Sequence, residues 1–429
     1  MLEEKGNYEK EEAELRARQV AILQGIYDSG GVKSVLQFTD KIENVRLAGF
    51  CASNFLSNAD IYELIMSSAD INNDAFLHGI IRNLSFDRTK KILEGLSDTK
   101  KAKTLAILPL CDPIVEYIKG LEKESQLQYW KNIEAWGWFG EGFTLVEDTI
   151  KNLNECGRTD ISISILHIFT RKDESKVNPQ LVADTLIRKV DNKSLSTHDT
   201  YEIQELIKWL QERQADRASL ILIEWKYLAL LREDEGYPPI NLWEELSSNP
   251  EHFMYILKIF TGRERGSEWT DEDKSKMIQH CYHLLESWKR TPGIENTGKI
   301  NKDNLDNWVS VVKKLSRQSG IEKQAMMYFG KAAFYAPADE DGFFIDMEVA
   351  KYLQDDKEGS MLSGYHSEAI NSRGVHTIDP TGEAEFKIEE QYMIKARAAD
   401  EKGLIRFAGT LREIAESYHE EGIRNKELG

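Results

Sequence analysis

The chain has 429 residues, of which 41% are hydrophobic, 30% are charged and nine are proline. This hydrophobic share can fill a sizeable core, so it excludes global disorder, and so few prolines leave long windows in which a helix can continue. Lys and Arg number 55 against 73 Asp and Glu, which gives a formal charge of −18. Because nucleic-acid-binding proteins neutralise phosphates with basic residues, this charge argues against nucleic acid as the main partner.

The N-terminal segment and the cysteines both bear on the compartment. Residues 1–19 carry acids where a signal peptide has a basic region followed by an apolar one. No apolar run reaches the ~18 residues that would span a bilayer, and the longest apolar-rich window, 218–231, is interrupted by Glu224 and Lys226. The four cysteines form no CxxC motif, which indicates free thiols in a reducing compartment. We therefore expect a soluble cytoplasmic protein that does not associate with a membrane.

Apolar residues recur at helical spacing along most of the chain, which predicts a succession of amphipathic helices. The clearest pattern is in the last segment, where apolar positions of 404–418 follow i, i+3, i+4, i+7 behind a break at Gly403. Period-two alternation is scarce, and its nearest instance, 161–165, also fits a helix. We therefore predict an all-α fold. The other helical stripes cover 10–28, 41–56, 141–155, 199–213, 216–232, 271–289, 302–317, 321–335 and 383–400.

Short polar turns at 153–160, 210–216 and 315–322 each separate two of these stripes. Turns this short force the flanking helices to run antiparallel as αα-hairpins, the unit of helical-repeat solenoids. The turns are spaced irregularly, and no window meets the tetratricopeptide signature. The prediction is an irregular αα-hairpin repeat, an α-solenoid of tetratricopeptide or HEAT-like type, with a helical C-terminal region.

Breaks in the helical pattern divide the chain into four predicted parts. The longest break, 355–382, is dominated by Gly, Ser, Asn and Asp, which predicts an irregular segment of functional importance. The parts are an N-terminal helical bundle or repeat at 1–135, central αα-hairpin repeats at 136–235, C-terminal helical repeats at 236–354, and the irregular loop with a terminal helical hairpin at 355–429.

No motif for metal, cofactor or covalent chemistry is complete. His280 and His283 stand three residues apart on a predicted helix, as a metal pair can, but no further ligand follows at a familiar spacing. The acidic run 339–344 lacks the later ligands of a calcium loop. Phosphate-binding glycine loops and a Gly-x-Ser-x-Gly elbow are also missing. We assign no catalytic residue, no metal and no cofactor.

One alternative enzyme reading concerns Arg412 and His419, which lie seven residues apart and so on one helix face. This spacing is similar to the loose form of the motif of HEPN-type ribonucleases, in which an Arg and a His cleave RNA at a dimer interface. The residue after the arginine is Glu413, where that motif usually has Asn or Asp. A solvated charged face is the competing interpretation.

Two loops carry the candidate partner-binding residues. Trp136, Trp138 and Phe139 lie among glycines, so they form either a buried turn or an exposed aromatic anchor of the kind that dominates interfaces. In the predicted irregular segment, His366, Asn371 and Arg373 either hold the loop in place or face a partner. The expected partner is another protein, and the acidic charge favours one with a basic surface.

Several short segments resemble the C-terminal helical-repeat region of very long, uncharacterised bacterial multidomain proteins. The similar segments are 26–31, 108–110, 129–130, 371–375, 379–383 and 403–418. Those proteins are labelled as helix-turn-helix regulators or resemble STAND-type phage-defence proteins, in which nucleotide-binding and effector parts lie upstream and a helical-repeat region is the sensor. The resemblance implies a non-catalytic scaffold or sensor, the recognition region of a bacterial defence or regulatory system.

Overall fold

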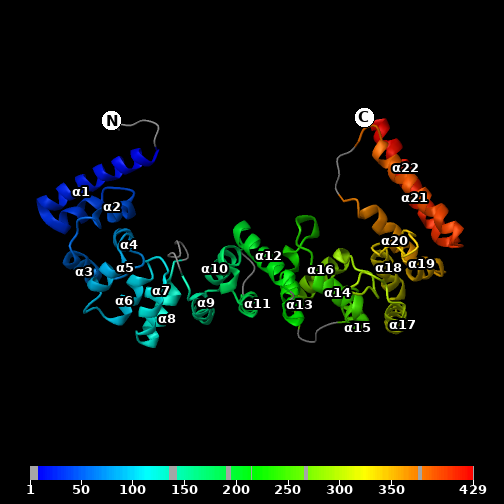
Figure 1. Ribbon diagram of the computed structural model, residues 1–429, viewed down its shortest axis with the longest axis horizontal. Helices are drawn as coiled ribbons and strands as arrows, with labels where there is room; N and C mark the ends of the chain where they lie inside the picture. The colour runs from blue at the N-terminus through cyan, green and yellow to red at the C-terminus, as the bar shows by residue number, and fades with distance from the viewer. Residues whose placement is uncertain are drawn as a thin grey trace. The chain divides into compact units, whose positions relative to one another are not determined.

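A computed structural model describes residues 8–134, 143–189, 195–213, 215–264, 269–374 and 379–428. Within these ranges the chain folds into α-helices and short 3-10 turns with no strand, and the one β-bridge joins Ile294 and Ile300 (Figure 1). The predicted all-α fold is confirmed. None of the described helices is both long enough and apolar enough to cross a membrane.

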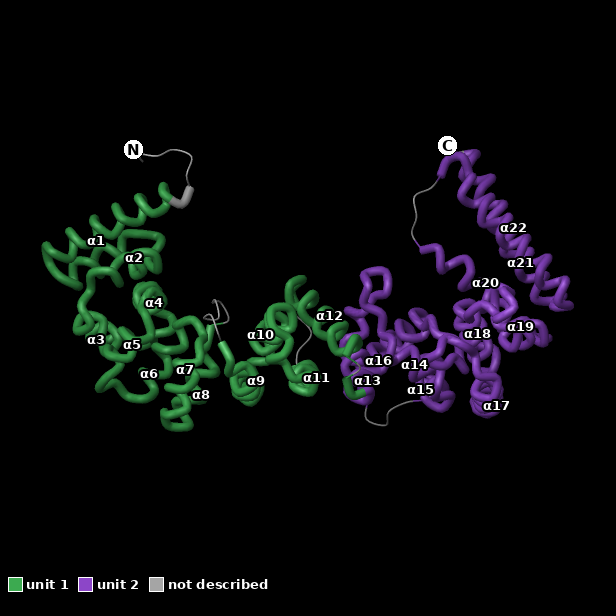
Figure 2. The backbone as a smooth tube through the Cα atoms, in the orientation of Figure 1, with its two compact units in different colours: residues 1–216 green, residues 217–429 purple. Residues whose placement is uncertain are grey.

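The helices fall into two compact units, residues 1–216 and 217–429 (Figure 2). The helices of the first unit are α1 (Tyr8–Thr39), α2 (Val45–Ala52), α3 (Asn58–Ser67), α4 (Ala75–Arg82), α5 (Phe86–Ile92), α6 (Asp98–Leu105), α7 (Asp112–Lys119), α8 (Lys123–Asn132), α9 (Val146–Glu155), α10 (Thr159–Lys172), η1 (Glu174–Lys176), α11 (Pro179–Arg188) and α12 (Thr197–Glu212).

Those of the second unit are α13 (Arg217–Lys226), η2 (Leu228–Leu230), η3 (Glu233–Glu235), α14 (Ile240–Ser248), α15 (Pro250–Phe260), α16 (Asp271–Ser287), α17 (Lys302–Ser319), α18 (Glu322–Ala333), α19 (Met347–Gln354), α20 (Ser360–Asn371), α21 (Glu383–Glu401) and α22 (Ile405–Leu428). The boundary between the units, at residue 216, coincides with none of the boundaries of the predicted four-part division.

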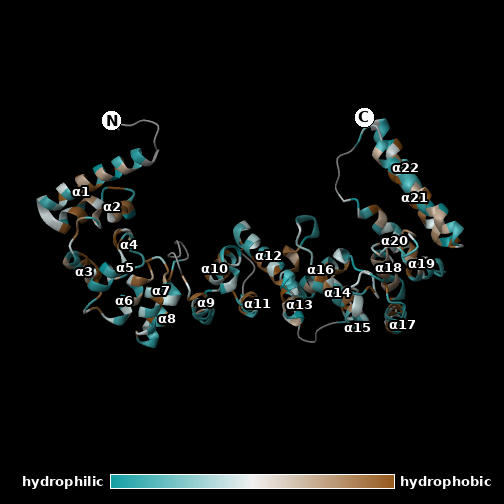
Figure 3. Cartoon of the chain, in the orientation of Figure 1, coloured by the Kyte–Doolittle hydropathy of each residue, from teal (hydrophilic) through white to brown (hydrophobic). Residues whose placement is uncertain are grey.

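Helix–turn–helix pairs form at two of the predicted polar turns, between α9 and α10 and between α17 and α18. Gly157, at φ +76°, follows α9, and Gly320, at φ +67°, ends α17, so both turns use the left-handed region that favours glycine. The α17 end is closed by the amide of Ile321, which donates to the carbonyl of Ser316 at 3.0 Å. Figure 3 shows apolar and polar residues on the same helices, as expected when one face of each packs against its neighbours.

In each unit, a pair of helices that are not consecutive in the chain crosses closely at glycines. A Cβ atom at Gly49 of α2 would lie 2.0 Å from the carbonyl oxygen of Phe76 on α4. The second unit repeats this arrangement between α18 and α20, where a Cβ at Gly364 would lie 1.9 Å from the carbonyl oxygen of Met327. In both units the crossing joins a helix to the second helix after it, which is a repeated element of the architecture.

Basic side chains connect more distant helices by satisfying the carbonyl groups left free at helix C-termini. Lys100 in the first turn of α6 donates to the carbonyls of Ile65 and Met66, at 2.9 and 2.6 Å, at the end of α3. Arg406 at the start of α22 donates in the same way to the carbonyl of Gln354, the last residue of α19. We call these contacts the Lys100 and Arg406 staples.

The prediction of an irregular segment over 355–382 is wrong for residues 360–371, which form α20. The carboxylate of Asp356 accepts hydrogen bonds from the amides of Met361 and Leu362, at 2.7 and 3.1 Å, and so caps the helix. Gly364 is needed for the close crossing with α18, not for a loop. The expected tight turn before α21 is present, since the amide of Gly382 donates to the carbonyl of Asp379 at 3.0 Å.

Candidate functional site

The candidate site lies along α16 in the second unit. This helix begins with a capping box, in which Thr270 and Asp273 each bond the other's backbone amide at 3.1 Å. Its buried face carries Cys281, Leu284 and Leu285. The opposite side borders two hollows, and His280 lines the first whereas His283 lines the second.

The first hollow, which we call the Trp hollow, has a volume of about 410 Å³. Its residues are Trp225, Lys226, Trp269, Asp273, Lys276, Met277 and His280. The ring of His280 meets Trp225 edge to face, with centroids 4.4 Å apart, and its Nε2 lies 2.6 Å from the Trp225 carbonyl oxygen. Because a carbonyl oxygen can only accept, Nε2–H of His280 donates to it, and burial lowers the pKa of this imidazole.

The second hollow, the α16–α20 groove, is larger, with a volume of about 1090 Å³. One wall is formed by residues 228, 229 and 231–234, and the other by the C-terminal part of α20 and residues 372–374. Between them, α16 supplies His283, Glu286 and Ser287, and Lys289 lies just beyond the end of that helix. Asn371 and Arg373, two of the predicted partner-binding residues, line this groove. It is open and rich in charged side chains, unlike the enclosed and mainly apolar sites that hold small molecules.

Charges in the groove are held in defined pairs. Glu286 accepts a hydrogen bond from the hydroxyl of Tyr328 at 3.0 Å and pairs with Lys331 at 2.6 Å. Glu368, buried on α20, accepts from the hydroxyl of Tyr335 at 2.5 Å. Burial, reinforced by the neighbouring carboxylate, raises the pKa of both tyrosines, so they remain donors.

The two hollows neighbour each other along α16. Trp225 and Lys226 line the first and Leu228 and Ala229 the second, so neighbouring residues of one segment serve both. On α16, His280 and Glu286 are six residues apart, which at ~1.5 Å per residue separates them by ~9 Å along the helix axis. We call the two hollows together the α16 track.

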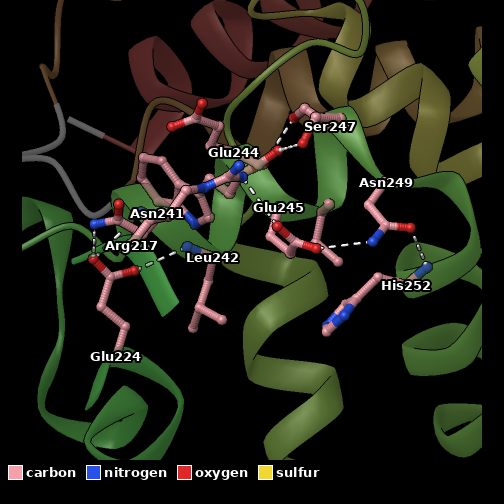
Figure 4. Close-up of polar contacts among 12 residues, drawn as sticks. Arg217, Glu224, Asn241, Leu242, Glu244, Glu245, Ser247, Asn249 and His252 are labelled. Atoms are coloured by element: carbon pink, nitrogen blue, oxygen red, sulfur yellow. Dashed lines mark hydrogen bonds and ion pairs between the residues drawn. The ribbon is translucent and has the colours of Figure 1, made fainter. Parts of the chain in front are cut away.

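A buried carboxylate fixes the wall behind the track (Figure 4). Glu224, which is 0% exposed, accepts hydrogen bonds from the Leu242 amide at 2.9 Å and from the Asn241 side chain at 2.7 Å. These contacts cap α14 directly after the Pro238–Pro239 pair, where Pro239 offers no amide donor. Because Trp225 follows Glu224 and Trp243 follows Leu242, the same cap positions one aromatic residue of each hollow.

A second polar chain continues from α13 to α15 (Figure 4). Glu245 pairs with Arg217 at 3.0 Å and accepts from the side chain of Asn249 at 2.9 Å. Asn249 in turn accepts from the amide of His252 at 3.0 Å and so caps α15. Burial lowers the pKa of His252, although the charge of Glu245 acts in the opposite direction. These contacts hold α13, α14 and α15 in fixed register behind the track.

The structure places the predicted partner-binding residues differently from one another. Trp136, Trp138 and Phe139 lie outside the described residues. His366 is half-buried on α20, and Asn371 is exposed at its end.

Arg373 is largely enclosed by the terminal hairpin. It pairs with the buried Glu385 of α21 at 2.5 Å, with Glu421 of α22 at 3.5 Å, and lies over the ring of Tyr418. Although burial acts to raise the pKa of Glu385, its hydrogen bond from Arg373 lowers that pKa below the usual range. This geometry matches the interpretation in which Arg373 holds its loop in place, and its contact with a partner stays a prediction.

Arg412 and His419 each have a separate carboxylate partner on α21. Arg412 pairs with Asp400, and Nδ1 of His419 lies 2.8 Å from Glu389. Both side chains are roughly half exposed, at 45% and 47%. The structure therefore gives each residue a carboxylate partner within the terminal hairpin, and the ribonuclease alternative stays a prediction.

Among the described residues, no group of three His, Cys, Asp or Glu side chains is placed to hold a metal ion. His280 and His283 border different hollows, and the first is engaged with the carbonyl of Trp225.

Trp225, Trp269 and Met277 were not predicted as site residues. A signal for Trp269 is present in the sequence, because it directly precedes the capping-box residue Thr270. An apolar residue at this position usually packs against the fourth residue of the helix, but that residue is Lys274. A tryptophan without an apolar staple partner is a candidate for another contact.

The comparisons with known proteins give no relative: no protein family, curated protein or solved structure matches this chain.

Proposed function

We propose that this chain is a non-catalytic helical-repeat scaffold that binds a segment of another protein along the α16 track. The observation that carries the proposal is that an aromatic hollow and a charged, open groove neighbour each other on one helix. Protein interfaces combine such features, since buried aromatic anchors supply most of the binding energy and a polar rim supplies specificity. A solenoid of the tetratricopeptide or HEAT-like type presents extended surfaces of this kind.

Two broader assignments belong to the same proposal. The scaffold works in the cytoplasm, and it serves as the recognition region of a bacterial defence or regulatory system. The second assignment rests on the resemblance of its short segments to long bacterial multidomain proteins.

Selection of binding peptides from a random display library tests the proposal. We expect enriched peptides to bind the wild-type chain and to lose about tenfold or more in affinity to Trp269→Ala, because truncating an aromatic anchor removes its buried contact. Tyr255→Ala is the matched control, since Tyr255 is an exposed aromatic residue on α15 that does not line either hollow. Failure to enrich any peptide, or equal binding by both variants, would contradict the proposal.

A further inference from the structure

We infer that residues 10–29 of α1 form a strap, hinged at Gly30 and Gly31, that closes over α2 and the first turn of α3. The bend at Gly31 holds the strap in its closed position, and a change to helical angles at this joint swings the strap away. The inference concerns the first unit and goes beyond the proposed function, because it does not involve the α16 track.

The joint has a backbone conformation that depends on glycine. The helical angles of α1 are interrupted at Gly30 (φ −166°, ψ 22°) and Gly31 (φ 68°, ψ −162°), and the chain is helical on both sides. The angles of Gly31 lie in a region that is essentially confined to glycine. Glycine also adopts helical angles, so this residue permits both a bent and a straight α1.

The glycines of the joint are not packed against another element. A Cβ atom at Gly31 would have no described atom within 4 Å, and one at Gly30 would meet only the side chain of Ser34 in the same helix. Gly49 and Gly79 differ, because each lies against the backbone of a neighbouring helix. A change of the backbone angles at the joint therefore breaks no packing contact at the glycines themselves.

The two arms of α1 differ in how much apolar surface they bury. In the short arm after the joint, Val35 and Thr39 are both buried. Leu23 is the only buried residue of the longer strap, whereas Leu15 and Ile22 are 49% and 61% exposed. Small apolar burial is typical of segments that open locally while the rest of a protein stays folded.

Two side chains of the strap make the contacts that close it. The hydroxyl of Tyr27 donates to the carboxylate of Asp60 on α3 at 2.9 Å, and its ring centroid lies 5.5 Å from that of Phe55. The guanidinium of Arg16 lies 4.7 Å from the ring centroid of Phe50 on α2, a cation–π contact. Both phenylalanines are half-buried, so opening of the strap would expose an aromatic surface.

The acceptor for Tyr27 is held in place without the strap. Asp60 forms the capping box of α3 with Ser57, accepting from its amide at 2.9 Å and from its hydroxyl at 2.6 Å. The hydrogen bond to Asp60 raises the pKa of Tyr27, so the hydroxyl stays a donor. Because the cap fixes this carboxylate, the strap can leave it and return to it.

The test measures the distance between the strap and α3 in the full chain. Ketone-bearing amino acids replace the exposed Ala17 and Ala59 and carry nitroxide labels, and double electron–electron resonance gives the distance distribution. We expect Gly31→Ala to create a longer-distance population, because alanine disfavours the bent angles and favours helical ones. Ala17 lies ~21 Å from the joint along the helix, so rotation there should lengthen the distance by about 10 Å or more.

Gly25→Ala is the matched control. Gly25 lies in the strap at helical angles, and a Cβ there also has no described atom within 4 Å, so the distance should stay unchanged. Tyr27→Phe keeps the joint and removes the hydrogen bond to Asp60, so it should give a longer-distance population smaller than that of Gly31→Ala.

Circular dichroism checks that each variant keeps its helix content, and if Gly31→Ala loses it, Tyr27→Phe decides alone. A folded Gly31→Ala chain with the wild-type distance distribution would overturn the inference. An equal shift in Gly25→Ala would overturn it as well, because the effect would then not depend on the joint.

Discussion

The glycine crossings of the two units share a backbone arrangement but differ in the side chain beside the glycine. In α4, His78 precedes Gly79, and its Nε2 lies 2.7 Å from Glu134. In α18, Lys331 follows Gly330 and pairs with Glu286. Both crossings thus send a nitrogen-bearing side chain to a carboxylate on another element. Of the two carboxylates, only Glu286, the partner of the lysine, lines the groove.

The shared feature and the differing feature have separate roles. The glycine crossings pack the helices together, whereas the side chain beside the glycine contributes to the proposed binding groove in the second unit. The close approach of backbones at the glycines is a property of the packing and is present in both units. The residue next to the glycine differs between the two units, and in the second unit Lys331 fixes Glu286 in the groove. A substitution at the glycine should therefore lower the free energy of unfolding more than a substitution beside it.

The largest effect is expected at the crossings themselves. Gly364→Ala and Gly79→Ala should each destabilise their unit by about 3 kcal/mol or more, because the added methyl group meets a backbone carbonyl that no rotamer change can move. Chemical denaturation followed by circular dichroism measures the change. Gly409→Ala is the control, since nothing lies within 4 Å of its Cβ position in α22, and it should raise stability by about 0.5–1 kcal/mol. If all three variants changed the free energy of unfolding equally, close packing at the glycine crossings would not be the cause.

A smaller effect is expected beside the glycine. Lys331→Met should lower the free energy of unfolding by about 1–2 kcal/mol, because Glu286 loses its cation and keeps only the Tyr328 hydroxyl. Lys323→Met on the exposed side of the same helix is the control and should change stability little. The same denaturation experiment compares the two, and an equal loss in both would show that the Glu286 pair adds nothing.

Loss of the Lys100 or the Arg406 staple should lower the free energy of unfolding less than Lys331→Met does. The two losses should be about equal, although one staple lies in each unit. Lys100→Gln and Arg406→Gln each remove a charged donor from the carbonyls at a helix end, which should cost about 0.5–1 kcal/mol. Shifts in the denaturation midpoint measure this cost. The exposed Lys90→Gln of α5 should leave the midpoint unchanged, and a shift of the same size there would contradict the assignment.

The smallest effect is a pH dependence located in the second unit. Burial places the pKa of His280 and of His252 below the ordinary value of 6.5. The unfolded chain then binds more protons than the folded one as the pH falls below 6.5, so these histidines should reduce stability progressively down to their depressed folded-state pKa values. Hydrogen exchange at pH 7 and 5.5 should show α16 and its neighbours losing protection more in the wild type than in His280→Gln. An unchanged profile in that variant would argue against the role of His280.

Helices and several turns could be predicted because their signals are local. The stripe over 404–418 is confirmed by the burial of Phe407, Leu411 and Ile414 in α22, and the glycine turns after α9 and α17 follow from residue type. The helix over 360–371 was missed because Gly364 reads as a loop former when its partner across the crossing, Met327, is unknown. A glycine that permits close packing and a glycine that ends a helix look alike in sequence.

The candidate site was predictable only in fragments. Asn371 and Arg373 were singled out, and both line the groove, yet the buried partner of Arg373 is a glutamate on another helix. His280 and His283 were compared as a metal pair, but their surroundings differ because α13 covers one and α20 approaches the other. Glu224 was visible as a charge in an apolar window, and its role as a cap depends on where the next helix begins.

The staples also determine the smallest structural module that could be transferred to another protein. Each ties the start of one helix to the end of the third helix before it, α6 to α3 and α22 to α19. Removing or transplanting a single hairpin would therefore leave the C-terminal carbonyls of a remaining helix without their side-chain hydrogen-bond donor. The smallest module that carries its own helix-end partners is a block of four helices, and chimeras or truncations cut at such blocks should fold where cuts inside them do not.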